Sequence, residues 1–214
     1  MLDFEKFARA AHAHGVPLIV DNTFATPVEL PPLRVGGPTL SPTPLAKYMD
    51  GHANAVGGAI VDSGRFDWTA HADKFPGLTT PDESYHGVTY TERFGLEGAY
   101  ITKATAQLMR DFGAIPAPMN AYLLNVGLET LPLRMARHCE NALAVARFLK
   151  GHPKVSWVRY PGLEGDPYYE RARKYLPNGT CGVVSFGVKG GREAASKFMA
   201  GLELASIATH VADA

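Results

Sequence analysis

The stretch that decides the fold class is Val16-Pro17-Leu18-Ile19-Val20-Asp21-Asn22-Thr23. It follows a segment, residues 4–14, whose apolar side chains recur at helical spacing between a capping residue, Asp3, and a terminating glycine, Gly15. A short apolar run directly after a helix is typical of a strand buried on both faces, and such strands belong to the parallel sheets of α/β proteins. Polar residues at the carboxyl end of such a strand, here beginning with Asp21, lie where α/β sheets bind ligands.

A second buried strand is predicted over residues 55–61, and the segment between the two strands is rich in proline. The prolines are Pro27, Pro31, Pro32, Pro38, Pro42 and Pro44. Because proline has no backbone N–H to donate, we expect no central strand through residues 38–44. Two buried strands cannot complete a parallel sheet, so we expect either a partner chain or further N-terminal sequence to supply the rest.

The remainder of the chain changes character near residue 150. Residues 65–98 are aromatic and turn-rich, which predicts a long ordered loop with short helical pieces, and a helix is predicted over 97–112. Residues 117–150 are predicted as two helical stretches that meet near Gly127 and Pro132. Beyond them the pattern alternates between strand and helix. The predicted strands are 155–160 and 182–188, and the predicted helices are 167–175 and 195–202. We therefore expect a large domain over residues 1–150 and an incomplete small α+β domain over residues 151–214.

The composition is that of a globular protein without an evident charged partner. The 214 residues are 46% hydrophobic, and the 21 basic and 21 acidic side chains balance, so nothing electrostatic favours nucleic acid or an anionic membrane. No apolar run approaches the roughly 20 residues that span a bilayer. Two cysteines, Cys139 and Cys181, are too few for a disulfide framework, and the acidic N-terminus lacks a signal-peptide core, so a cytoplasmic location is expected. No histidine, cysteine and carboxylate spacing predicts a metal site.

Asp21 and Lys47 form the candidate chemical pair. A carboxylate at a strand end can pair with a protonated ring nitrogen, and a partly desolvated lysine can act as nucleophile and base. These are the two minimal parts of a pyridoxal-phosphate site. From residue types alone, a structural salt bridge between them is the commoner explanation.

The sequence around this pair resembles the Cys/Met-metabolism family of pyridoxal-phosphate enzymes. The motifs that carry the resemblance are Val20-Asp21-Asn22-Thr23-Phe24-Ala25-Thr26-Pro27, Lys47-Tyr48-Met49-Asp50-Gly51-His52, Gly57-Gly58-Ala59-Ile60-Val61, Lys74-Phe75-Pro76-Gly77-Leu78, Ser84-Tyr85-His86-Gly87, Gly127-Leu128-Glu129-Thr130-Leu131, Arg137-His138-Cys139-Glu140-Asn141-Ala142, Arg159-Tyr160-Pro161-Gly162-Leu163 and Phe186-Gly187-Val188-Lys189-Gly190-Gly191. The resemblance implies an α/β fold of the aspartate-aminotransferase type (fold type I). Within the family, the motifs look most like those of the O-acetylhomoserine sulfhydrylases.

This resemblance implies roles for three residues. Lys47 is expected to anchor pyridoxal 5'-phosphate covalently and to act as general base, Asp21 to face the pyridine nitrogen, and Thr43 to be the hydroxyl nearest the cofactor phosphate. The implied reaction is γ-replacement on O-acetylhomoserine with sulfide or a thiol, giving homocysteine or methionine, in a dimer or tetramer. Other members, such as cystathionine γ-synthase, cystathionine γ-lyase and methionine γ-lyase, and an inactive fragment of such an enzyme, remain alternatives.

The chain also departs from the family pattern. Thr43-Pro44-Leu45-Ala46 stands where a hydroxyl run precedes the lysine, and the interval from Asp21 to Lys47 is one residue longer. We hypothesise that residues 38–44 reflect a shifted reading frame, which resequencing of the DNA would decide. The family's phosphate loop and its carboxylate-binding arginine have no counterpart here, so we expect about half of an enzyme.

Several other polar residues have structural interpretations. His52 is expected to be a hydrogen-bonded structural histidine, and Cys139 to be a packing residue within a helix. Arg134 and Arg137 could contact an anion, although a solvated helix face is the default expectation for both.

Overall fold

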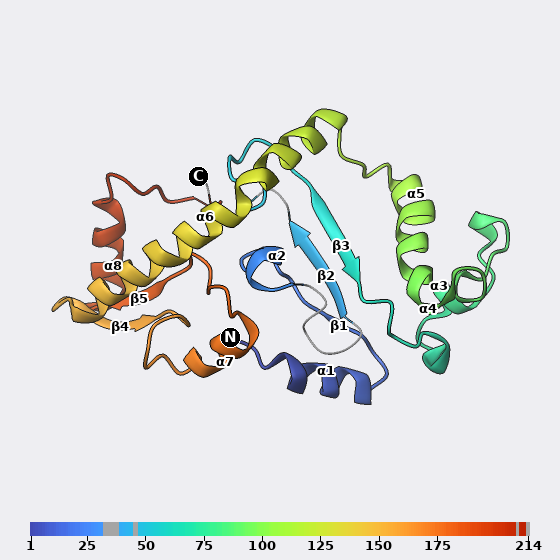
Figure 1. The fold of residues 1–214 in the computed structure, drawn as a ribbon, viewed down its shortest axis with the longest axis horizontal. Coiled ribbons are helices and arrows are strands. Elements are labelled where there is room, and N and C mark those ends of the chain that lie inside the picture. Colours follow the sequence, from blue (N-terminus) through green and yellow to red (C-terminus); the bar gives the residue numbers. More distant parts are fainter. Residues whose placement is uncertain (32–38, 45–46, 209, 213–214) are drawn as a thin grey trace.

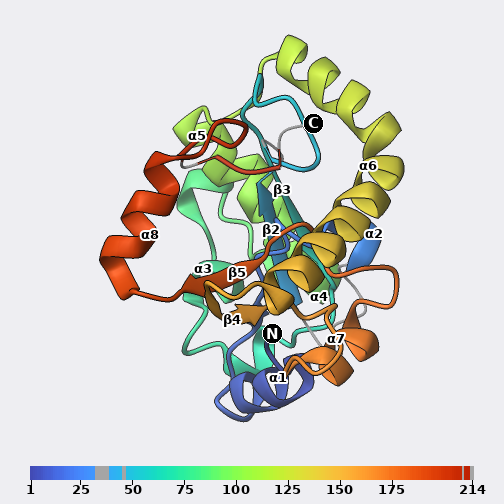
Figure 2. The same cartoon turned by 90° about the vertical axis from the view of Figure 1, so that its left-hand side faces the viewer.

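A computed structural model describes residues 1–31, 39–44, 47–208 and 210–212, and for residues 39–44 it describes the backbone. A small sheet lies in the middle of the molecule, with the helical segment that ends in α5 on one side and the elements β4 to α8 on the other (Figure 1). The long helix α6 runs from the first side to the second past the sheet, which the second view also shows (Figure 2). No helix among the described residues combines the length and apolar character needed to cross a membrane.

Helix α1 (Phe4–Ala13) confirms the first predicted helix. The Asp3 side chain accepts a hydrogen bond from the Lys6 backbone N–H at 3.3 Å, which caps the first turn. The chain leaves the helix through Gly15, whose φ of +63° is the left-handed conformation that favours glycine. Phe4 and Ala8 are buried, and they fix which face of α1 packs inward.

The sheet contains β1 (Leu18–Ile19), β2 (Thr39–Pro44) and β3 (Gly58–Asp62), in that spatial order. Strand β1 runs parallel to β2, and β2 runs antiparallel to β3. The prediction of two strands buried on both faces is wrong: Ile19 is 59% exposed and Ile60 is 48% exposed. A strand is buried on both faces only where helices cover both, and the exposure of Ile19 and Ile60 shows that part of each strand is uncovered among the described residues.

The prediction that no central strand passes through residues 38–44 is also wrong, because β2 is the middle strand. Its ladder with β1 pairs only Thr39 and Leu40, whereas its ladder with β3 continues to Pro44. Pro42 and Pro44 therefore have a strand neighbour on one side only. A missing N–H is tolerated in a strand where no partner faces it, and β2 meets that condition on its β1 side.

Residues 66–112 form a compact unit of short helices, which confirms the predicted long ordered loop. Its elements are η2 (Thr69–His71), α3 (Pro76–Thr79), η3 (Glu83–Tyr85), α4 (Tyr90–Thr102), a π-helical segment (Lys103–Met109) and α5 (Arg110–Phe112). Gly95, with a φ of +68° and a ψ of 179°, interrupts α4, and the helical structure that resumes after it and runs to Phe112 confirms the helix predicted over residues 97–112. The unit has its own core, made of Phe66, Trp68, Leu78, Tyr90 and Ala99.

Helix α6 (Pro118–Gly151) is continuous, so the prediction of two helical stretches is wrong. Pro132 removes one helical hydrogen bond, but Leu131 and Met135 on either side of it are buried against Tyr48. Packing therefore holds the helix together across the proline. Gly127 does not end a helix; it lets α6 approach the backbone of residues 49 and 50, because an added Cβ would lie 2.5 Å from the carbonyl oxygens of Met49 and Asp50.

The chain after α6 alternates strand and helix as predicted. The elements are β4 (Val155–Arg159), α7 (Tyr169–Tyr175), β5 (Ser185–Val188) and α8 (Gly191–Ala200), with β4 antiparallel to β5. This unit also contacts α1, because the Tyr175 ring meets Phe4 edge-on at 5.1 Å and its hydroxyl donates to Asp3 at 3.1 Å. The domain boundary at residue 150 stays a prediction.

The close approach at Gly127 predicts a large penalty for the smallest added side chain. In the variant Gly127→Ala the new methyl group meets two backbone carbonyls that cannot move independently, so we expect the free energy of unfolding to fall by about 1–3 kcal/mol. Gly151→Ala, at the end of the same helix with nothing within 4 Å, is the matched control and should be neutral or slightly stabilising. Urea unfolding of both variants measures the difference, and equal stabilities would contradict the close-packing argument.

Candidate active site

Asp21 lies just past the carboxyl end of β1, where the chain turns into α2 (Thr26–Glu29). One carboxylate oxygen, Oδ1, accepts hydrogen bonds from the Thr23 backbone N–H at 2.9 Å and from the Thr23 hydroxyl. The other oxygen, Oδ2, has no hydrogen-bond partner among the described residues, and the side chain is exposed. Thr23 thus orients the carboxylate while leaving one oxygen available to a ligand.

A cavity of about 690 Å³ opens beside Asp21. Its walls come from α1, from β1 and the segment after it, and from residues 159–185 of the C-terminal unit. The lining is mostly apolar, with polar side chains that include Asp21, Asn22, Arg159 and Ser185. A mainly apolar cleft with a few polar groups is the usual form of a small-molecule site.

Lys47 begins the turn that leads from β2 towards β3, and it is half-buried. Its carbonyl oxygen accepts a hydrogen bond from the Gly51 N–H at 2.7 Å, which closes the turn. The next residue, Tyr48, is buried, and its ring meets Phe24 edge-on at a centroid distance of 6.4 Å. The segments that carry Asp21 and Lys47 therefore follow parallel strands in the same direction and touch through Phe24 and Tyr48.

Of two predictions about this site, the structure tests the one on Asp21 and Lys47 but not the one on Thr43. Among the described side chains, Asp21 and Lys47 form no ion pair with each other, so the structural salt bridge that residue types favoured is not present. Thr43 lies in β2 opposite Ala59, but its side chain is outside the described part of the structure, so its role at a phosphate stays a prediction.

Arg134 on α6 is the residue that sequence reasoning missed. Its guanidinium donates from Nη1 to the Tyr48 carbonyl at 2.6 Å, and from Nη2 to the carbonyls of Gly127 at 2.8 Å and Met49 at 3.4 Å. Its Nε donates to the Thr130 hydroxyl at 3.0 Å. The prediction of a solvated helix face is therefore wrong for Arg134. It fits Arg137, which is exposed and pairs with Glu140 at 3.3 Å. The one available signal was Gly127, because a glycine within a helix often marks a close approach.

The turn after Lys47 has further internal contacts. Asp50 is buried and accepts a hydrogen bond from the Asn54 N–H at 3.1 Å. The Nδ1 atom of His52 lies 3.0 Å from the Asp50 carbonyl, which agrees with the structural role predicted for His52. Tyr48 reaches the C-terminal unit, because its hydroxyl accepts a hydrogen bond from the Gly182 N–H at 3.2 Å. The lysine turn is thus held by α6 on one side and by the segment before β5 on the other.

A buried acid, Glu29, lies beside this arrangement at the end of α2. The Cys139 thiol donates a hydrogen bond to Glu29 Oε1 at 3.4 Å, and Oε2 has no partner among the described residues. Burial raises the pKa of Glu29 from its usual 4.5 to about 7. Burial, together with the Glu29 charge, raises the pKa of the Cys139 thiol to about 12, and burial also raises the pKa of Cys181. Both thiols are therefore protonated at neutral pH, in agreement with a packing role for Cys139.

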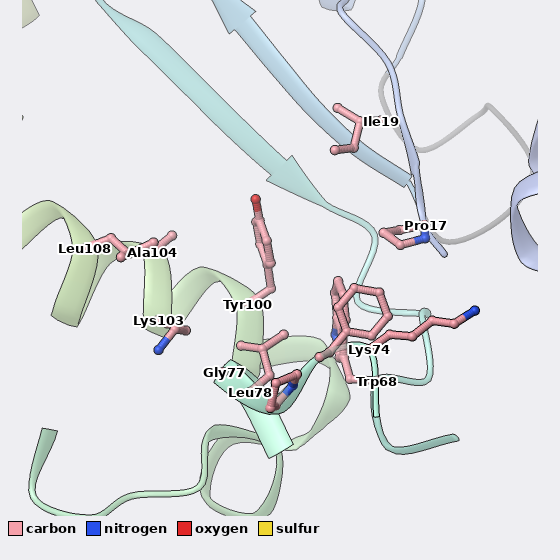
Figure 3. A pocket seen from close by; sticks show the side chains of 12 residues that line it. Pro17, Ile19, Trp68, Lys74, Gly77, Leu78, Tyr100, Lys103, Ala104 and Leu108 are labelled. Atoms are coloured by element: carbon pink, nitrogen blue, oxygen red, sulfur yellow. The ribbon is translucent and has the colours of Figure 1, made fainter. Parts of the chain in front are cut away.

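A second cavity, of about 410 Å³, lies between β1 and the helical unit 66–112 (Figure 3). Pro17 and Ile19 line it from the β1 side, and Trp68, Leu78 and Tyr100 line it from the helical side. Neither Asp21 nor Lys47 borders this space, and of the two only Asp21 lines the cavity of about 690 Å³. Within the described residues, no three histidine, cysteine or acidic side chains lie close enough together to hold a metal ion.

Comparison with known proteins gives concordant results. The family described as Cys/Met metabolism PLP-dependent enzymes matches residues 1–214. The chain is 46% identical over 212 residues to a homocysteine synthase of Schizosaccharomyces pombe, covering 99% of this chain and 49% of that protein. It is 43% identical over 211 residues to O-acetyl-L-homoserine sulfhydrylase 1 of Thermus thermophilus, again covering 99% of this chain and 49% of the relative.

A solved structure extends the comparison to three dimensions. A Campylobacter jejuni crystal structure described as an O-acetylhomoserine (thiol)-lyase, with N'-pyridoxyl-lysine-5'-monophosphate in its chain, superposes with a TM-score of 0.86 at 35% identity. The match covers 100% of this chain and 52% of that one. It confirms the predicted fold class, a partial PLP-dependent transferase fold. The chain spans about half the length of the relatives it matches.

The raised pKa of Glu29 predicts a dependence of stability on pH. The folded state holds a proton that the unfolded state releases at lower pH, so the free energy of unfolding falls as the pH rises from about 4.5 to about 7 and stays low above that. The loss attributable to Glu29 is up to about 3 kcal/mol. We expect Glu29→Gln to flatten this slope, measured by urea unfolding between pH 5 and pH 8. Glu129→Gln, an exposed position on α6, should leave the slope unchanged; a slope that persists in Glu29→Gln would assign it to other groups.

Proposed function

The chain belongs to the Cys/Met-metabolism family of PLP-dependent enzymes, and on that premise we propose that its activity is γ-replacement on O-acetylhomoserine with sulfide or a thiol, giving homocysteine or methionine. The observation that carries the proposal is the 43–46% identity over 99% of the chain to relatives named homocysteine synthase and O-acetyl-L-homoserine sulfhydrylase. The chain spans about half the length of those relatives. We therefore propose a reaction in which residues of this chain take part, and we do not assign to this chain every residue that the reaction requires.

The residues of the candidate site fit pyridoxal phosphate in kind. Asp21 offers a carboxylate oxygen without a partner among the described residues, beside a cavity of about 690 Å³, and Lys47 is half-buried and not paired with that acid. A carboxylate opposite the pyridine nitrogen keeps that nitrogen protonated, and a lysine amine can bind the cofactor aldehyde. Bound pyridoxal phosphate supplies an electron sink that stabilises negative charge at the substrate Cα.

In the proposed reaction, Lys47 acts twice. Its Nζ would hold the cofactor aldehyde, and its amine would take and return protons at the substrate Cα and Cβ. Acetate leaves from Cγ, and sulfide or a thiol adds there. Thr23 contributes by fixing the orientation of Asp21 through two hydrogen bonds to Oδ1. We assign Thr43 to the cofactor phosphate as part of the same proposal.

The proposal includes the setting of the site. We place the boundary between a large cofactor domain, residues 1–150, and a small domain, residues 151–214, at the end of α6. We propose a homodimer or homotetramer in the cytoplasm, with an amino-acid substrate and no nucleic acid or membrane partner.

Two alternatives share the same residues and are separated by experiment. Other activities of the family, those of cystathionine γ-synthase, cystathionine γ-lyase and methionine γ-lyase, also require an anchoring lysine and a ring-facing acid. An inactive fragment is favoured by one observation, the coverage of only about half of each relative.

The decisive test combines cofactor binding with product analysis. Purified protein incubated with pyridoxal phosphate and then reduced with borohydride should carry the cofactor on Lys47, located by peptide mass spectrometry, and Lys47→Ala should abolish both this label and any conversion of O-acetylhomoserine and sulfide to homocysteine. Lys154→Ala, at an exposed position, is the control. Labelling without product supports the inactive fragment, another product identifies another family activity, and no labelling of Lys47 overturns the proposal.

A further inference from the structure

We infer that Arg134 is the positioning residue for Lys47, holding the lysine turn against α6 through its guanidinium. The inference rests on the proposed function, because it gives a role to the lysine assigned there. Arg134 does not itself touch a substrate or cofactor in this arrangement; it acts on the backbone that carries Lys47.

The contacts of Arg134 are directed at the turn and at one point of its own helix. Two consecutive carbonyls of the turn, those of Tyr48 and Met49, accept from Nη1 and Nη2, and the Gly127 carbonyl on α6 accepts from Nη2. One planar group thereby joins the two residues that follow Lys47 to a fixed position on α6. The Thr130 hydroxyl, one turn earlier on the helix, accepts a hydrogen bond from Arg134 Nε, which fixes the direction of the arginine side chain.

Two glycines make this approach possible. A Cβ at Gly51 would lie 2.7 Å from Arg134 Nη1, and Gly51 has a φ of +75°, so the turn has no room for a side chain where the guanidinium sits. A Cβ at Gly127 would collide with the Met49 and Asp50 carbonyls. The turn and α6 are therefore packed backbone to backbone, and Arg134 satisfies the carbonyls that this packing removes from water.

The chemistry of the side chain suits this task. A guanidinium presents several N–H donors in a rigid plane and stays charged, whereas an ammonium is a single point charge. Burial lowers the pKa of Arg134, and the nearby Asp50 carboxylate acts in the opposite direction. Because hydrogen bonds from a charged donor are stronger than neutral ones, the two contacts with the Tyr48 and Met49 carbonyls hold the turn more firmly than a neutral side chain would.

The consequence for Lys47 is that the backbone from which its flexible side chain extends is held in place. The Lys47 carbonyl is bonded to the Gly51 N–H at 2.7 Å, so the Lys47 backbone moves with the turn that Arg134 holds. Holding the backbone reduces the number of directions in which Nζ can point, and this favours reaction with an aldehyde bound in one place. Loss of Arg134 should thus weaken the reaction at Lys47 without altering lysines elsewhere.

The experiment compares Arg134→Ala with Arg137→Ala, a variant that removes an arginine one turn further along α6 from an exposed ion pair. Each protein is titrated with pyridoxal phosphate and reduced with borohydride, and the labelled lysines are quantified by mass spectrometry. We expect Arg134→Ala to lower the labelling of Lys47 about tenfold, as loss of a charge-assisted hydrogen bond would. Exposed Lys197 serves as an internal reference whose labelling does not change.

Rescue separates positioning from simple loss of structure. Millimolar guanidinium ion should restore part of the Lys47 labelling in Arg134→Ala and have no effect on Arg137→Ala, and Arg134→Lys should fall between wild type and Arg134→Ala. Amide hydrogen exchange provides a readout that needs no cofactor: the Gly51 N–H should exchange faster in Arg134→Ala than in Arg137→Ala or wild type.

These measurements test the proposed function and the positioning role of Arg134 separately. Wild-type protein that is not labelled at Lys47 overturns the proposed function, while the Gly51 exchange rate still decides whether Arg134 holds the turn. Labelling of Lys47 that is equal in Arg134→Ala and wild type overturns the positioning role. Unchanged exchange at Gly51 overturns it as well.

Discussion

The contact between helix α6 and the turn after Lys47 is the constraint on which the rest of the arrangement depends. At Gly127 the helix comes so close to the Met49 and Asp50 carbonyls that no side chain fits between them. Backbone carbonyls brought this close to a helix lose water, and Arg134 replaces it with charged donors. The glycine makes the approach possible, and the arginine stabilises it.

The same helix connects the lysine turn to the C-terminal unit. The Tyr48 ring meets the His138 ring of α6 edge-on, with 5.1 Å between the ring centroids. The Tyr48 hydroxyl accepts a hydrogen bond from the Gly182 N–H. Tyr160 donates towards the carbonyls of Cys139 on α6 and of Cys181, at 3.3 Å and 2.9 Å. The segment that contains Cys181 and Gly182 is therefore linked to α6 through Tyr160 and to the residue next to Lys47 through Gly182.

Sequence reasoning identified the residues with distinctive chemistry and missed those whose role comes from geometry. Asp21 and Lys47 were singled out by the family motifs around them, because from residue types alone a structural salt bridge was the commoner explanation, and their roles stay predictions. Arg134 could not be singled out, since an arginine on an amphipathic helix usually faces water. The burial of β1 was overestimated because an apolar pentapeptide cannot reveal whether helices cover both faces of its strand. Strand β2 was missed because proline excludes a strand only where a partner needs its N–H, and that depends on the register with β1.

The two parts of the proposed chemistry, the reaction at Lys47 and the binding of the cofactor phosphate, depend on different elements of the structure. Ile19 on β1 and Ile60 on β3 are exposed on the two outer strands, and sheet edges with exposed apolar residues are normally covered. The lysine turn lies away from both edges, packed against α6 and the segment before β5. In the proposed function, the position of Lys47 would therefore depend on α6 and on the segment before β5. Thr43, which we propose for the cofactor phosphate, stands instead in β2, between the two outer strands, so its position would depend on the sheet and not on α6.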